Sequence, residues 1–254
     1  MSILKIDGVS KYFGGVTAVV DFSMMQGENE ITGIIGPNGA GKTTVFNLIT
    51  GVYPLDTGRI FFLSKDITES PAHKRTEAGI SRTFQNIRLF NNLNVLDNMK
   101  VAYGWKVRYS LWEEMIRLPS VVREEREIDE RARHFLEYLG LTEYADQKPN
   151  NLPYGIQRRL ELARTLIAEP KLLLLDEPAA GLNPREVVSL MGMINKLQQD
   201  YNLSIIIVEH HMELIMKICS LIHVLDFGKK IAEGKPEDIK KNELVLQAYL
   251  GDEG

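Results

Sequence analysis

Cysteine is nearly absent from this sequence, because Cys219 is the only one among 254 residues. An internal disulfide is therefore excluded, and the chain suits a reducing compartment such as the cytoplasm. Long apolar runs are also absent, since none approaches the ~20 residues with which a helix crosses a bilayer. The N-terminus does not show the basic and then apolar pattern of a signal peptide. We therefore expect any work at a membrane to depend on another chain that carries this one there.

An excess of charge of one sign is missing as well. There are 30 basic and 34 acidic residues, which give a formal net charge of −4 at pH 7. This balance excludes a general electrostatic attraction to DNA, RNA or anionic lipid, so we expect no nucleic-acid partner. With 44% hydrophobic and 25% charged residues, the composition is that of an ordinary globular protein. The length suffices for one α/β core, alone or with a smaller lobe.

A glycine-rich segment, residues 36–44, stands between a strand pattern and a helix pattern. The apolar run Ile31–Ile35 precedes it, and the helical pattern Val45–Ile49 follows it. This is the context of a phosphate-binding loop, whose backbone N–H groups and helix dipole face a phosphate. Lys42 would reach the β- and γ-phosphates, and the Thr43 hydroxyl would hold Mg²⁺. The nucleotide-binding residues expected here are Gly36, Pro37, Asn38, Gly39, Ala40, Gly41, Lys42, Thr43 and Thr44.

Two adjacent carboxylates close another apolar run. Asp176 and Glu177 follow four consecutive leucines, Leu172–Leu175, which predict a fully buried strand. At the carboxyl end of a parallel strand, Asp176 is suited to hold Mg²⁺, and Glu177 to accept a proton from an attacking water. An acidic pair on the surface is the alternative, and the presence of a phosphate loop favours the catalytic interpretation.

A histidine and a glutamine also follow strand patterns. His210 comes two residues after the apolar run Ser204–Val208, where a neutral imidazole could hydrogen-bond the γ-phosphate or the attacking water. Gln85 ends the run Ile80–Phe84, and its amide could touch Mg²⁺ or water. A structural histidine and an exposed glutamine are the alternatives. We treat both residues, together with Glu177 and Lys42, as candidate catalytic residues.

The strand and helix patterns predict an α/β fold with a P-loop NTPase core. We expect a mixed, mainly parallel sheet, an N-terminal antiparallel β layer from residues 3–9 and 16–24, and an inserted helical subdomain. Strand signals vanish and charge rises after residue 86. The expected divisions are residues 1–85 for the first part of the core, 86–165 for the helical subdomain and 166–254 for the second part of the core with two closing helices.

The helical subdomain carries a charge-rich helix with an apolar stripe. Its buried side is expected to consist of Ile128, Ala132, Phe135 and Leu139. Pairs four residues apart, Glu127 with Arg131 and Asp129 with Arg133, would support its exposed side. A second apolar stripe consists of Trp105, Tyr109, Trp112 and Ile116. We expect this stripe to pack within the subdomain, with contact to a partner as the alternative.

In order along the chain, these motifs resemble those of ABC-type ATPases over essentially its whole length. The resemblance identifies Leu152, Pro153, Tyr154 and Gly155 as the signature, which acts on the ATP of a partner subunit, and Ala180–Asn183 as a loop at the dimer contact. Phe13 matches the aromatic residue on which the adenine stacks, with Tyr12 as the alternative. The resemblance also implies that Asp176, Thr43 and Gln85 hold the metal.

Among subfamilies, the chain resembles the ATP-binding subunits of branched-chain amino-acid importers, the LivG type. The segments responsible are residues 11–15, 81–85, 151–155 and 178–184, the closing residues 248–251 and the long insert 105–133. The resemblance implies ATP and Mg²⁺ as cofactors, membrane-spanning permease subunits as partners, and a second ABC ATPase, related or identical, packed head to tail. It implies a peripheral location on the inner face of the cell membrane, where residues 85–90 and the insert would dock to the permease.

The signature departs from the family pattern at two positions. Pro153 stands where serine is usual, and Ile156 stands where glutamine is usual. Because proline has neither a hydroxyl nor an N–H, one expected donor to the γ-phosphate is missing. Two alternatives to an importer ATPase therefore stay open: an ABC-type ATPase not tied to transport, and a nucleotide-dependent scaffold with little turnover.

Overall fold

The computed structural model describes residues 2–83, 85, 87–107 and 109–250. Three residues named in the predictions, Phe84, Asn86 and Gly251, lie outside the described residues. The chain divides into two compact units, one formed by residues 1–85 with 170–254 and one by residues 86–169. Among the described residues, no helix combines the length and the apolar character needed to span a membrane.

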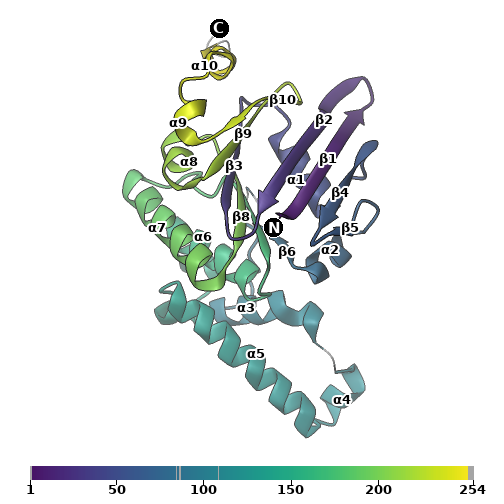
Figure 1. The fold of residues 1–254 in the computed structure, drawn as a ribbon. Coiled ribbons are helices and arrows are strands. Elements are labelled where there is room, and N and C mark those ends of the chain that lie inside the picture. Colours follow the sequence, from purple (N-terminus) through teal and green to yellow (C-terminus); the bar gives the residue numbers. More distant parts are fainter. Residues whose placement is uncertain (1, 84, 86, 108, 251–254) are drawn as a thin grey trace. The chain divides into compact units, whose positions relative to one another are not determined.

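The first unit contains a four-stranded antiparallel sheet in the order β2-β1-β4-β5 (Figure 1). β1 (Ser2–Phe13) pairs with β2 (Val16–Gly27) through a turn in which Gly14 has a φ of 56°. β4 (Thr57–Phe62) and β5 (Lys65–Asp66) complete the sheet. The expected N-terminal antiparallel layer is therefore confirmed, and its strands extend beyond the predicted limits.

A second sheet of six strands, in the order β10-β9-β3-β8-β7-β6, forms the centre of the same unit. Five of its strands are parallel, and β10 runs antiparallel to β9. This confirms the expected mixed, mainly parallel sheet. Because the carboxyl ends of parallel strands share one edge, the segments after β3, β6, β7 and β8 meet there. The strands are β3 (Ile31–Ile35), β6 (Ile80–Arg82), β7 (Leu172–Asp176), β8 (Ser204–Val208), β9 (Leu221–Asp226) and β10 (Lys229–Gly234).

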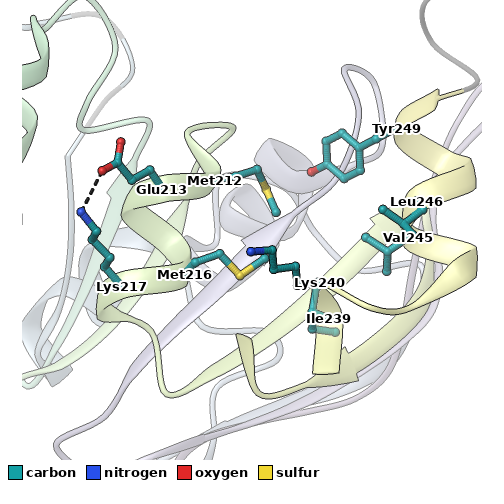
Figure 2. Close-up of a pocket in the computed structure, with 9 residues that line it drawn as sticks. All are labelled: Met212, Glu213, Met216, Lys217, Ile239, Lys240, Val245, Leu246 and Tyr249. Carbon is teal, nitrogen blue, oxygen red and sulfur yellow. Dashed lines mark hydrogen bonds and ion pairs between the residues drawn. The ribbon is translucent and has the colours of Figure 1, made fainter. Parts of the chain in front are cut away.

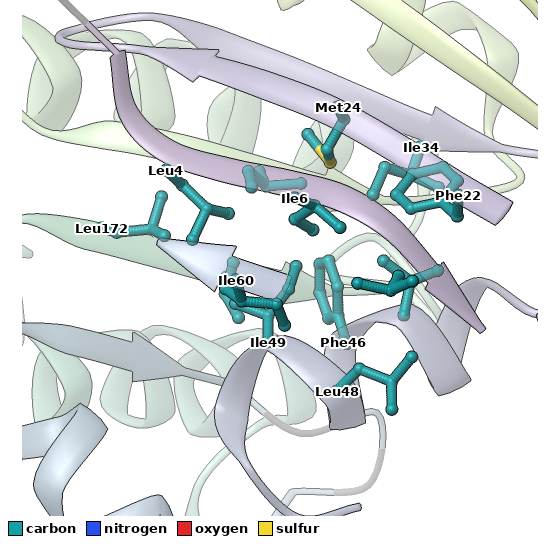
Figure 3. Packing of buried hydrophobic residues seen from close by; sticks show 14 of the residues in the cluster. Leu4, Ile6, Phe22, Met24, Ile34, Phe46, Leu48, Ile49, Ile60 and Leu172 are labelled. Carbon is teal, nitrogen blue, oxygen red and sulfur yellow. The ribbon is translucent and has the colours of Figure 1, made fainter. Parts of the chain in front are cut away.

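The apolar core of this unit lies where α1 (Lys42–Thr50) meets the strands. Phe46 and Ile49 of this helix pack in one buried cluster with Ile6, Phe22 and Ile60 from the antiparallel sheet (Figure 3). These side chains are essentially inaccessible to solvent. Burial of this kind contributes roughly 1.5–3 kcal/mol for each large apolar side chain. The core therefore fixes the helix that follows the glycine-rich loop.

The remaining helices of the first unit are α2 (Ala72–Ala78), α7 (Pro184–Tyr201), α8 (Met212–Ile218), α9 (Pro236–Ile239) and α10 (Glu243–Leu250). Met212 and Met216 of α8 face Val245 and Tyr249 of α10 across an apolar pocket of about 560 Å³ (Figure 2). The Tyr249 hydroxyl is buried, and this burial raises its pKa, although the backbone N–H of Gly36 acts in the opposite direction. The Tyr249 hydroxyl thus lies near the Gly36 backbone, without a hydrogen-bond partner among the described residues.

The second unit is helical. It comprises α3 (Val95–Tyr103), α4 (Leu111–Met115), α5 (Pro119–Tyr138) and α6 (Tyr154–Leu166), with short 3₁₀ turns at Gly104–Lys106, Thr142–Tyr144 and Pro149–Asn151. The predicted apolar stripe of α5, from Ile128 to Leu139, is buried, and Asp129 pairs with Arg133 at 2.7 Å. Arg131, which the sequence pairs with Glu127, contacts Glu169 instead.

The packing predicted for the second apolar stripe is wrong at three of its four residues. Trp112 is 75% exposed, Ile116 is 69% exposed and Trp105 is 43% exposed. The reason is the length of α4, whose five residues make little more than one turn. A helix this short cannot bury a stripe spaced over twelve positions. These side chains therefore form an exposed apolar surface on the second unit.

We predict that Arg75→Met destabilises the first unit. Arg75 is 2% exposed, and its guanidinium donates to the Leu48 and Ile49 carbonyl oxygens at 2.6 and 2.9 Å, at the end of α1. Methionine would remove the charged donor from both carbonyls and leave Leu48 only the Gly51 N–H at 3.3 Å, at a cost of about 3 kcal/mol. Urea unfolding followed by circular dichroism measures the change. Wild-type stability in Arg75→Met would contradict this role.

Candidate active site

The glycine-rich loop runs from the end of β3 into α1 in a shape that other residues cannot adopt. Gly36 has a φ of 151°, and a Cβ there would lie 2.0 Å from the Leu225 carbonyl oxygen. Gly41 has a φ of 101°, and a Cβ there would lie 2.4 Å from the Ala18 carbonyl oxygen. Gly41 is also the N-cap of α1, and no side chain caps the helix. The first-turn N–H groups of α1 are therefore suited to donate hydrogen bonds to a bound anion.

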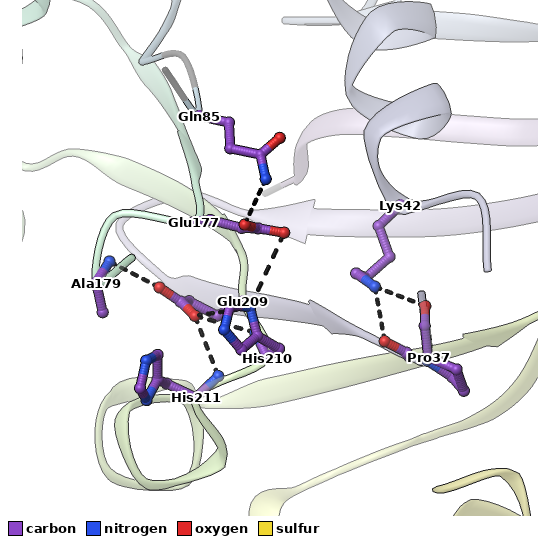
Figure 4. A network of polar contacts seen from close by, with 9 residues as sticks. Pro37, Lys42, Gln85, Glu177, Ala179, Glu209, His210 and His211 are labelled. Atoms are coloured by element: carbon purple, nitrogen blue, oxygen red, sulfur yellow. Dashed lines mark hydrogen bonds and ion pairs between the residues drawn. The ribbon is translucent and has the colours of Figure 1, made fainter. Parts of the chain in front are cut away.

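Lys42 points back into this loop. Its side chain is buried, and Nζ donates to the carbonyl oxygens of Gly36 and Pro37 at 2.6 and 2.8 Å (Figure 4). The ammonium group thus lies inside the curve of the loop, where an incoming phosphate would compete with these two carbonyls. Thr43 follows it in the first turn of α1 and is exposed.

Asp176 ends β7 and is 2% exposed. Arg82 donates from Nη2 to Asp176 Oδ2 at 2.6 Å and from Nη1 to Asn47 Oδ1 at 2.6 Å. Burial raises the pKa of the Asp176 carboxyl, and the hydrogen bond from Arg82 partly offsets that effect. Sequence reasoning assigned no role to Arg82. The one signal for it was a charged residue inside a short strand pattern with apolar residues at both ends.

Glu177 lies at the centre of a polar cluster just beyond β7 (Figure 4). Gln85 donates from Nε2 to Glu177 Oε2 at 2.7 Å, and His210 Nδ1 lies 3.9 Å from Glu177 Oε1. The backbone of Glu177 is left-handed, with a φ of 46°. For a glutamate this conformation is strained, and such strain concentrates at functional sites. The structure therefore brings together three of the candidate catalytic residues.

Glu209 is a buried carboxylate that sequence reasoning missed. It is fully buried, and its Oε1 accepts from the Ala179 N–H at 2.7 Å. Its Oε2 accepts from the backbone N–H groups of His210 and His211 at 3.0 and 3.1 Å. Glu209 thus ties the segment after β7 to the segment after β8 and fixes the backbone that carries His210. A glutamate directly after a buried strand was the available signal.

The predicted adenine platform is an exposed ring at the end of β1. Phe13 is 41% exposed, and its ring lies 5.1 Å from the Tyr53 ring in an edge-on arrangement. The Lys11 ammonium lies 5.4 Å from the centre of the Phe13 ring. Tyr12, the alternative, is 44% exposed. Both side chains are exposed to a similar extent, so the choice between Phe13 and Tyr12 stays a prediction.

The predicted signature lies in the second unit, at the start of α6. Pro153 is the N-cap, and no side chain caps the helix. Gln157 donates to the Leu152 carbonyl oxygen at 2.9 Å, and the guanidinium of Arg158 lies 5.5 Å from the centre of the Tyr154 ring. The helix start thus offers backbone N–H groups and a positive dipole end in place of a side-chain hydroxyl.

The side chains expected to hold the metal are a hydroxyl, a carboxamide and a carboxylate. Thr43, Gln85 and Asp176 offer hard oxygen atoms, which Mg²⁺ prefers, and Mg²⁺ in nucleotide enzymes takes the rest of its ligands from phosphates and water. Within the described ranges, no group of three or more His, Cys, Asp or Glu side chains could hold a metal by itself. The donor set therefore fits a magnesium ion that arrives with a nucleotide.

Comparisons with known proteins identify the family of the chain. The family model of the ABC transporter matches residues 19–180, and that of the branched-chain amino acid ATP-binding cassette transporter matches residues 229–254. The chain is 42% identical over 250 residues to the high-affinity branched-chain amino acid transport ATP-binding protein BraF of Pseudomonas aeruginosa, with 98% of each protein covered. It is 41% identical over 250 residues to the corresponding protein LivG of Escherichia coli K12, with the same coverage.

A solved structure shows the same fold. An ATP-binding cassette of an ABC transporter, in its ADP conformation, superposes with a TM-score of 0.86 at 30% sequence identity and covers 99% of both chains. The fold, the family models and the identity to BraF and LivG agree with the resemblance found in the sequence. The chain belongs to the ABC transporter ATP-binding proteins, and within them to the branched-chain amino acid transporter type.

Proposed function

We propose that this chain is the subunit that binds and hydrolyses ATP in a branched-chain amino acid importer, with its catalytic residues at the carboxyl edge of the central sheet. The observation that carries the proposal is the contact of Gln85 and His210 with the two oxygens of Glu177, beyond the same sheet edge as the glycine-rich loop. The similarity to BraF and LivG supports the choice of solute.

The glycine-rich loop would bind the phosphates. Its backbone N–H groups and the start of α1 face an anion, and Lys42 would exchange its contacts with the Gly36 and Pro37 carbonyls for contacts with phosphate oxygens. Phe13 would stack on the adenine. A bound Mg²⁺ would neutralise charge on the β- and γ-phosphates, held by Thr43, Gln85 and Asp176.

Glu177 would act on the attacking water. Its carboxylate accepts the water proton, while Gln85 and His210 orient the carboxylate and the water through the contacts described above. Glu209 accepts from the His210 backbone N–H and so fixes the backbone from which the imidazole extends. Phosphoryl transfer to water requires an oriented nucleophile and neutralised phosphates, and these roles supply both. No covalent intermediate is needed.

A second ABC ATPase subunit would complete the site. No side chain caps α6, so its first turn offers N–H groups to a γ-phosphate held by a partner packed head to tail. ATP would then favour the closed dimer and hydrolysis the open one, which drives permease subunits between two states. The chain would lie on the inner face of the membrane through these permeases.

We predict that Glu177→Gln lowers ATP hydrolysis by about 10²–10⁴, the contribution of a general base. Nucleotide binding and the ATP-stabilised dimer should persist, because the phosphate loop is unchanged. Steady-state hydrolysis and size-exclusion chromatography with ATP measure the two quantities. Glu213→Gln, on the exposed side of α8, is the matched control and should hydrolyse ATP at the wild-type rate.

Two results of this comparison would contradict the proposal. Unchanged hydrolysis in Glu177→Gln would remove the assigned base. If wild type shows no turnover even with its permease partners, the chain acts as a nucleotide-dependent scaffold.

We predict that Gln85→Ala weakens coupling to the permease more than it weakens ATP binding. Gln85 contacts Glu177 on one side and begins the segment expected to dock to the permease. The ratio of permease-stimulated to basal hydrolysis should fall severalfold, while nucleotide affinity changes less than twofold. Gln198→Ala, at a half-buried glutamine on α7 that donates to Asn29, is the control. Equal loss of binding and stimulation would refute this division of roles.

A further inference from the structure

Arg82 connects the end of β7 with α1, the two elements that carry Asp176 and Thr43 of the proposed metal site. It ends β6 and contacts Asp176 at the end of β7 and Asn47 of α1, each at 2.6 Å. Its guanidinium also lies 5.4 Å from the centre of the Phe46 ring in the core. The side chains of Arg82 and Asp176 are 8% and 3% exposed. This ion pair is therefore shielded from water and held in one geometry by packing.

A carboxylate as deeply buried as Asp176 requires a cation nearby. An unpaired charge in such a place is strongly destabilising, because it loses its hydration without compensation. In the nucleotide-free chain Arg82 supplies this cation through Oδ2. A carboxylate has a second oxygen, so the Asp176 group can meet Arg82 and a metal ion from different sides. The same carboxylate thus serves two cations, one permanent and one that arrives with nucleotide.

We propose that Arg82 is a positioning residue that stands in for the metal cation: it neutralises and orients Asp176 before nucleotide binds and competes with Mg²⁺ for it afterwards. The inference rests on the proposed nucleotide site. Its consequence follows from linkage: whatever free energy Arg82 costs the metal at Asp176, the metal costs the contact of Arg82 with Asp176. Removal of Arg82 should destabilise the empty protein and strengthen its response to Mg²⁺.

Arg75 provides the matched control. It is also a buried arginine of the first unit, and it contacts backbone carbonyls at the end of α1. Loss of Arg75 should lower stability by the same amount with and without the metal. Asn47→Ala is a second control, because it removes one partner of Arg82 and leaves the contact with Asp176 in place.

The test is thermal unfolding of the purified chain with the non-hydrolysable analogue AMP-PNP at pH 8, titrated with MgCl₂ from an EDTA baseline. We expect Arg82→Met to melt below wild type in EDTA. The Mg²⁺ concentration for a half-maximal rise in Tm should fall at least about fivefold, the lower end of measured coupling between sites. Arg82→Lys keeps the charge and should retain the wild-type Mg²⁺ response. If Arg82→Met does not fold, Arg82→Gln takes its place with the same expectation.

Two outcomes would overturn the inference. An unchanged Mg²⁺ response in Arg82→Met would make Arg82 a structural brace like Arg75. A weakened response would mean that Arg82 assists metal binding and does not compete with it. Failure of the proposed site gives a different result: wild type itself would then show no Mg²⁺-dependent rise in Tm, or Asp176→Asn would keep the full response.

Discussion

The arrangement of residues at the carboxyl edge of the central sheet depends on carboxylates that are buried at the ends of parallel strands. Asp176 is 2% exposed and Glu209 is fully buried, and each is compensated within the chain. Arg82 supplies a full charge to Asp176, while three backbone N–H groups supply partial charges to Glu209. Without this compensation the loops after β7 and β8 would lose their fixed course. The position of Glu177 and His210 follows from it.

Much of the fold could be predicted because its strands are buried on both faces. Runs such as Leu172–Leu175 and Ser204–Val208 are typical of fully buried strands. The glycine-rich loop marks the start of α1. Gln85, Glu177 and His210 could be proposed for the same reason, since each follows a strand of the sheet. Their contacts around the one carboxylate of Glu177 depend on side-chain geometry, which the spacing of residues in the sequence does not show.

Other features could not be read from the sequence. Arg82 and Asp176 are 94 residues apart, and the choice of partner for a buried arginine depends on packing that pattern analysis does not describe. Glu209 was overlooked because its partners are backbone N–H groups, which every residue except proline carries. The exposure of Trp112 shows that a pattern can also predict burial that does not occur. An apolar stripe at helical spacing indicates burial only if the helix is long enough to form a face.

The contacts of Lys42 with its own loop bear on which ligands the proposed site would prefer. Because two carbonyl oxygens already hold the ammonium group, a ligand would gain from this lysine only the difference between its own attraction and theirs. A nucleoside or a monophosphate that does not reach Nζ would gain nothing there, whereas a polyphosphate with concentrated negative charge would displace both carbonyls. If nucleotide binds as proposed, the resting loop would therefore favour ligands with several phosphates, independently of any contact with the base.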